Sequence, residues 1–143
     1  MRKAILAMLM VSVSVAADGP KREAPKMPKL WATISISAPI FEPDKTDRLH
    51  VHFALVNDGD KTLNPEIESS ELLVNGKQLK DWAFIIGQGP RDDRFAALPP
   101  GDHLLFGYAL GDHFQKPGIY KLSWKGKNFQ SSQIVFRVLP KKE

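Results

Sequence analysis

The sequence predicts an all-β fold built from seven to eight short strands. Apolar and polar residues alternate along several segments, which is the pattern of a strand with one buried face. Residues that favour turns, chiefly Pro, Gly, Asn and Asp, separate these segments about every 8–15 residues. No segment after the first 17 residues shows the periodicity of a helix, so we expect strands and turns throughout the domain.

The C-terminal third of the chain carries the clearest succession of strands. A Pro- and Gly-containing turn at residues 98–102 precedes an alternating segment at 104–110. The Pro117-Gly118 turn starts a strand over 119–124, and a hairpin at 125–128 leads to a last strand with Ile134, Phe136 and Val138 on its buried face. Alternation bounded by turn residues is the strongest strand signal in a single sequence.

The N-terminal half of the domain repeats this pattern. Residues 30–37 and 48–57 alternate, and Leu49, Val51, Phe53 and Leu55 form the expected buried face of the second strand. A hairpin is expected within residues 66–79 because Asn75-Gly76 favours a two-residue turn. The apolar segment 82–86 follows. This number of short strands in about 100 residues predicts an immunoglobulin-like Greek-key β-sandwich.

Residues 1–17 have the features of a secretory signal peptide. Arg2 and Lys3 precede a short apolar segment, and small residues at 15–17 offer a cleavage site. We therefore expect an exported protein, periplasmic or secreted, with no membrane span after cleavage. The expected organisation is a signal peptide at 1–17, a flexible Pro/Lys leader at 18–29, the sandwich at 30–139 and a charged tail at 140–143.

Composition excludes several classes of function. Of the 20 basic residues two lie in the signal peptide, so 18 remain against 16 acidic residues, a net charge of +2. This balance, with no basic stripe, argues against nucleic-acid binding. The chain contains no cysteine, which excludes a thiolate metal site and a disulfide. No cofactor is expected.

Three segments resemble bacterial immunoglobulin-like domains of exported proteins. They are the alternating strand that runs into Asn57-Asp58-Gly59-Asp60-Lys61, the Leu98-Pro99-Pro100-Gly101-Asp102 turn with its strand, and Pro117-Gly118-Ile119-Tyr120-Lys121-Leu122-Ser123-Trp124. Their order is similar to that of the BsuPI-type domain, which is named after an intracellular proteinase inhibitor of Bacillus. The resemblance covers about residues 48–138 and implies a β-sandwich fold. It implies no inhibitory residue.

The first candidate for partner binding is the loop formed by Arg91, Asp92, Asp93 and Arg94. Four charges follow Gly87, Gly89 and Pro90, and aromatic residues flank the segment. Arginine and aromatic side chains are enriched in protein-binding hot spots, and long loops on rigid sandwiches often carry recognition. The alternative is a loop in which each arginine is paired with an aspartate.

Two other pairs of residues provide alternative sites. Trp31 and Trp82 are candidates for stacking against a sugar, although packing in the core or against the leader is the alternative. His50 and His52 lie two apart on one strand, so both imidazoles face the same side and are candidate metal ligands. A third ligand is needed, and solvent-exposed polar residues are the alternative. Tyr120 is expected to be structural, as a tyrosine corner.

No catalytic motif is present in the sequence, and we expect no enzyme activity. The sequence predicts an exported, non-enzymatic binding or accessory module that recognises a protein or cell-envelope component through its loops. Three alternatives remain open: a secreted protease inhibitor, a carbohydrate-binding module and a metal-binding exported domain.

Overall fold

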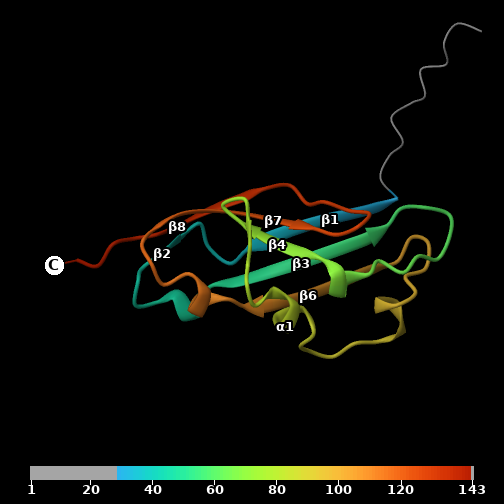
Figure 1. The fold of residues 1–143 in the computed structure, drawn as a ribbon, viewed down its shortest axis with the longest axis horizontal. Coiled ribbons are helices and arrows are strands. Elements are labelled where there is room, and N and C mark those ends of the chain that lie inside the picture. Colours follow the sequence, from blue (N-terminus) through green and yellow to red (C-terminus); the bar gives the residue numbers. More distant parts are fainter. Residues whose placement is uncertain (1–28, 143) are drawn as a thin grey trace, which may run out of the picture.

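A computed structural model describes residues 29–142, and within them most of the regular structure consists of strands in two sheets. The prediction of an all-β fold is confirmed. The expected signal peptide and residues 18–28 of the expected leader lie outside the described residues. Figure 1 shows the two sheets as layers that run along the long axis of the molecule.

The first layer is a three-stranded antiparallel sheet with the order β1-β3-β6. Its strands are β1 (Leu30–Ile36), β3 (His50–Asn57) and β6 (His103–Ala109). The alternation predicted for residues 48–57 is present, since Val51, Phe53 and Leu55 are buried while their neighbours are partly or fully exposed. Strand β6 lies at one edge of this sheet.

The second layer is a five-stranded sheet with the order β2-β8-β7-β4-β5. Strands β2 and β8 are parallel, and the other neighbours are antiparallel. Asn75 and Gly76 join β4 to β5 with φ angles of 51° and 81°, which are the positive values that this hairpin turn requires. The strands are β2 (Ile40–Phe41), β4 (Glu71–Val74), β5 (Lys77–Gln78), β7 (Gly118–Lys125) and β8 (Ile134–Val138).

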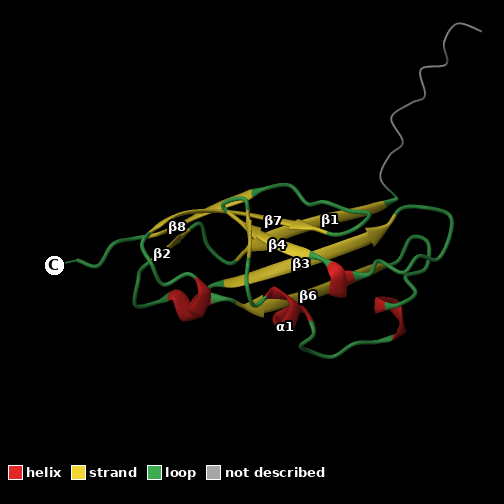
Figure 2. Ribbon diagram, in the orientation of Figure 1, coloured by secondary structure: helices red, strands yellow, loops and turns green. Residues whose placement is uncertain are grey.

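The expectation of a domain without helices is wrong. Residues Trp82–Ile86 form the short helix α1, and Figure 2 shows it beside β6. Trp82, Ile85 and Ile86 are its buried residues, a spacing of three and four that places them on one face of a helix. A single helical turn and a short buried strand leave the same apolar run in the sequence. Four 3₁₀ segments cover Thr46–Arg48, Ile67–Ser69, Asp93–Phe95 and Gly111–His113.

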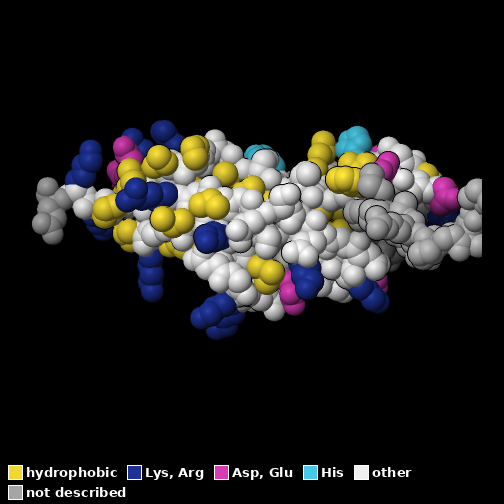
Figure 3. Space-filling view, turned by 90° about the horizontal axis from the view of Figure 1, so that it is seen from above, with side chains coloured by type: hydrophobic (Ala, Val, Ile, Leu, Met, Phe, Trp, Pro, Cys, Tyr) yellow, Lys and Arg dark blue, Asp and Glu magenta, His cyan; other side chains and the backbone are white. Residues whose placement is uncertain are grey.

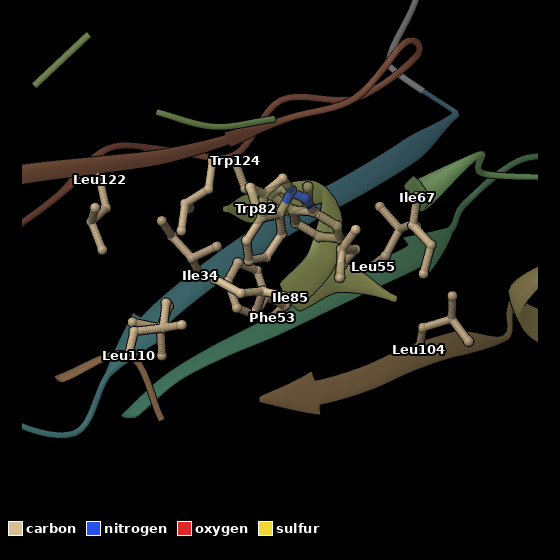
Figure 4. Close-up of a cluster of buried hydrophobic side chains, with 14 of the residues drawn as sticks. Ile34, Phe53, Leu55, Ile67, Trp82, Ile85, Leu104, Leu110, Leu122 and Trp124 are labelled. Atoms are coloured by element: carbon tan, nitrogen blue, oxygen red, sulfur yellow. The ribbon is translucent and has the colours of Figure 1, made fainter. Parts of the chain in front are cut away.

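Phe53 lies at the centre of the core. Its ring centroid is 5.2 Å from those of Trp82 in α1 and Trp124 in β7, and 5.3 Å from that of Phe106 in β6. Figure 4 shows Trp82 and Trp124 extending from their separate elements toward Phe53. One aromatic cluster therefore joins both sheets and the helix, and such contacts add about 0.5–1.5 kcal/mol per pair beyond burial of area.

The glycine at position 111 is required by a close backbone contact. A Cβ atom there would lie 1.9 Å from the carbonyl oxygen of Thr46, and both residues are buried. Gly111 begins one of the two Gly-Asp-His sequences of the chain, and this contact explains why a glycine is found there. The other begins at Gly101, which has a φ of 75° and no atom within 4 Å of such a Cβ.

We expect Gly111→Ala to lower the free energy of unfolding by about 2–4 kcal/mol, because a backbone clash forces two segments apart. Gly87→Ala is the matched control, since its Cβ would make an ordinary contact of 3.4 Å with Phe84 O; its effect should stay within about 0.5 kcal/mol. Urea unfolding of the three proteins measures both values. Equal stability of the two variants would contradict the explanation.

Candidate functional site

The outer face of the three-stranded sheet carries no Lys, Arg, Asp or Glu side chain, and we refer to it as the uncharged face. Cross-strand register places Trp31, Val56 and His103 in one row, and Thr33, Ala54 and Leu105 in the next. The remaining positions of the face are Ser35, His50, His52, Gly107 and Ala109. One quarter of the chain is charged, so an exposed sheet face without Lys, Arg, Asp or Glu is unusual for this composition.

The outer face of the five-stranded sheet provides the contrast. It also exposes apolar residues such as Ile119 and Val135, but Lys121 and Arg137 lie between them in the register. Figure 3 shows histidine side chains beside hydrophobic ones along the upper edge of the view, while many lysine and arginine side chains stand out along the lower edge and at the left end. Charge is therefore distributed unequally between the two faces.

A shallow hollow of about 390 Å³ lies on the uncharged face. Thr33, Ser35, His52, Ala54 and Leu105 contribute to its lining, together with Gly107. The small side chain of Ala54 and the missing side chain of Gly107 leave this space open. Position 107 also allows His52 to lie across β6, because a Cβ there would be 2.8 Å from the His52 Nδ1.

The two tryptophans proposed for sugar stacking are in different environments. Trp31 is 44% exposed on the uncharged face, whereas Trp82 is completely buried. The Trp82 indole donates a hydrogen bond to the Ser70 hydroxyl, and its ring packs against Phe53. The prediction that Trp82 offers a stacking surface is therefore wrong, because α1 directs this ring into the core.

His50 and His52 lie on the same exposed face, as their spacing predicts. The third histidine of the face, His103, pairs with Val56, four residues along β3 from His52. At about 3.3 Å per residue this is roughly 13 Å, which is too far for a shared metal. Within residues 29–142, no group of three or more His, Asp or Glu side chains is arranged to hold a metal ion.

The charged loop is held by its own ion pairs and by hydrogen bonds to the backbone. Arg91 pairs with Glu68, donates to the carbonyl oxygen of Ile86, and lies 5.4 Å from the centroid of the Phe95 ring. Arg94 pairs with Asp92 at 2.9 Å. The arginine side chains therefore fix the loop against the domain, although the pairing differs from the expected one because Glu68 is the partner of Arg91.

Arg94 also joins this loop to the start of β6. Its guanidinium donates to the carbonyl oxygen of His103 at 2.9 Å and contacts the carboxylate of Asp102 at 3.4 Å. Hydrogen bonds from the Arg94 side chain are the main reason that the pKa of Asp92 lies below its ordinary value. Asp93 is exposed in the 3₁₀ turn that follows Asp92. The four residues therefore form a turn that is tethered to the domain, and Asp93 forms no ion pair with any residue of 29–142.

Tyr120 is part of a second aromatic cluster, at the end of the domain away from Trp82. Its hydroxyl donates to the carbonyl oxygen of Lys116, four residues earlier in the chain. Its ring lies 5.1 Å from Phe114 and 5.3 Å from Phe136. These contacts are structural, and burial raises the pKa of the hydroxyl.

Comparison with known proteins returns no family: no protein-family model matches the chain, and no curated protein matches it significantly. The resemblance to BsuPI-type domains therefore stays a prediction. No helix among residues 29–142 is long and apolar enough to cross a membrane.

The outer sheet face was not predicted as a site, although the sequence contains its signal. The positions that alternate with the buried residues of β1, β3 and β6 can be read directly from the sequence, and none of them is charged. The order of the strands cannot be read from the sequence, and it is this order that brings the exposed positions of the three strands onto one face.

The Asp92–Arg94 pair predicts a specific dependence on pH. Since the pKa of Asp92 is lower in the folded chain than in the unfolded one, the pair stabilises the loop at neutral pH and this contribution is lost as the pH falls through the folded-state pKa. We expect Arg94→Gln to raise the midpoint of the Asp92 titration, measured by NMR of the side-chain carboxyl. An unchanged midpoint would show that another group holds the carboxylate.

The exposure of the tryptophans predicts a selective response to a quencher. Trp31 is the only one of the three that is more than slightly exposed, since Trp82 and Trp124 are both fully buried. We expect iodide to quench one fraction of the fluorescence, and Trp31→Phe to remove that fraction while the folded far-UV spectrum is retained. Persistence of an accessible fraction in the variant would place a second tryptophan at the surface.

Proposed function

We propose that this protein is a non-enzymatic binding module that recognises a protein or cell-envelope component through the outer face of the β1-β3-β6 sheet. The observation that carries the proposal is the absence of Lys, Arg, Asp and Glu from this face, while the outer face of the five-stranded sheet carries Lys121 and Arg137. Removing such a face from water needs no desolvation of ions, and depletion of charge is typical of the centre of protein interfaces.

The Arg91–Arg94 loop, which the sequence predicted as the binding surface, has a structural role in this proposal. A protease inhibitor of the loop-insertion type presents a loop whose side chains are free to enter the partner. Here Arg91 and Arg94 are engaged with Glu68, Asp92, Asp102 and two backbone carbonyls. We therefore favour the sheet face over the loop as the binding surface.

The proposal includes an immunoglobulin-like Greek-key topology and export from the cytoplasm. An immunoglobulin-like Greek key is supported by two packed sheets and by a tyrosine whose hydroxyl bonds the upstream backbone at Lys116. Export to the periplasm or the medium is supported by the sequence of residues 1–17. Together these features describe an exported accessory domain.

Carbohydrate recognition is the second candidate, and one observation favours it. Trp31 is 44% exposed at one end of the uncharged face, next to the hydroxyl side chain of Thr33, and Ser35 follows further along the same strand. A half-exposed aromatic ring beside hydroxyl groups is suited to stacking against a sugar. Binding that depends on Trp31 alone, and not on Leu105, would favour this candidate.

A pair of matched variants tests the proposal. Val56→Lys/Leu105→Lys places two charges on the uncharged face, and Ile119→Lys/Val135→Lys places two charges on the opposite sheet at similarly exposed strand positions. The mature chain and both variants are immobilised and exposed to the envelope and secreted fractions of the native organism. We expect a component that the wild type and the second variant retain and that the first variant loses at least about tenfold, because two buried charges lack partners.

Thermal melting of each variant confirms that the fold is intact before capture is compared. Equal capture by both variants would contradict the proposal, as would loss confined to the variant of the five-stranded sheet. Arg91→Ala/Arg94→Ala serves as the third arm of the experiment, and loss of capture in this variant alone would restore the loop as the binding surface.

A further inference from the structure

We propose that the edge of β6 from Leu105 to Ala109 binds an extended polypeptide segment of a partner protein as an additional β-strand. This inference rests on the proposed function, since it names the class of partner that the β1-β3-β6 sheet recognises. Figure 1 shows β6 as the last strand of that sheet, with the loop that follows α1 running beyond it.

The hydrogen-bonding pattern shows which backbone groups of β6 face away from the sheet. Leu110 N–H donates to Leu49 O, and Asn57 N–H donates to Asp102 O, each at 3.0 Å. Between these two bonded pairs the antiparallel register alternates, so Leu104, Phe106 and Tyr108 bond to β3. The N–H and C=O groups of Leu105, Gly107 and Ala109 therefore point outward, and no group in residues 29–142 bonds them.

The beginning of the same edge is already occupied by the protein itself. The carbonyl oxygen of His103 accepts a hydrogen bond from Arg94 at 2.9 Å, and its N–H donates to the Asp102 carboxylate at 2.7 Å. The open part of the edge thus starts at Leu105 and continues to the end of the strand. A partner strand would pair with these positions and leave the domain past Ala109.

A slot of about 220 Å³ lies along the open part of the edge. The loop supplies Gln88, Gly89 and Pro90 to its lining, the 3₁₀ turn supplies Phe95, and β6 supplies Leu105, Phe106, Gly107 and Tyr108. No charged residue lines it. Added strands are recognised through their backbone, and pockets accept alternate side chains. This slot has the size and polarity for one apolar side chain of the added strand.

The loop that borders the slot is fixed at both ends. Tyr108 donates its hydroxyl hydrogen bond to the carbonyl oxygen of Gln88 at 2.9 Å, and Arg94 holds the other end at His103. This arrangement selects a single strand over a second copy of the domain. If a second copy of the domain paired through its own β6, its 87–95 loop would meet the 87–95 loop of the first copy. An extended peptide carries no neighbouring loop and avoids this contact.

The experiment uses linear random dodecapeptides displayed on phage, selected against the mature chain and then synthesised with a fluorescent label. Anisotropy measures their binding to the wild type, Leu105→Ala and Leu105→Pro. The proline variant removes the outward N–H without breaking a bond to β3, as edge positions permit, and the alanine variant keeps it. Because both variants remove the Leu105 side chain from the slot, the test is the comparison between them: we expect the proline variant to bind at least about tenfold more weakly than the alanine variant.

Amide hydrogen exchange of the wild type provides a readout that needs no variant: Leu105, Gly107 and Ala109 should exchange freely and become protected when the peptide binds. If Leu105→Pro fails to fold, Ala109→Pro with Ala109→Ser as its control replaces it. Failure to select any binding peptide, equal binding by the proline and alanine variants, or protection elsewhere would overturn the inference. Loss of partner capture in Val56→Lys/Leu105→Lys with full retention in Leu105→Pro would support the face and exclude the edge.

Discussion

The packing of Phe53 against aromatic side chains from three other elements is the contact on which the architecture depends. Trp124 approaches from the five-stranded sheet, Phe106 from the neighbouring strand β6, and Trp82 from α1. Because one ring contacts all three, the separation of the sheets and the position of α1 are set together. Protein interiors are close-packed, so a change in one of these side chains displaces the others. The two sheets therefore cannot shift independently.

The same constraint places the candidate binding surfaces. With α1 fixed by Trp82, the chain that follows must run beside β6, and Tyr108 and Arg94 anchor it there. The inner side of the three-stranded sheet is then occupied by the core and this loop. Its outer side and the open edge of β6 remain available, because no second layer covers them among residues 29–142. Rigid support beneath an exposed surface is what a preorganised binding site requires.

The sequence was a good guide to strands and a poor guide to what lies between them. The buried face of β3 and the Asn75-Gly76 hairpin could be read directly, since alternation and turn chemistry are local properties. The orientation of Trp82 could not, because a five-residue helix is shorter than the window over which periodicity becomes visible. The pairing of Arg91 with Glu68, 23 residues away, and the edge position of β6 both depend on strand order, which no local pattern contains.

Asn57 shows how a chain without cysteine holds two distant turns together. This fully buried side chain donates to the carbonyl oxygens of Leu98 and Lys61, each at 2.8 Å, and accepts from the N–H of Gly59. It thereby joins segments 41 residues apart in the sequence through polar contacts, in a chain that has no cysteine for a disulfide. Reduction and oxidation leave such hydrogen bonds unchanged, so the position of these two turns does not depend on the redox state of the surroundings.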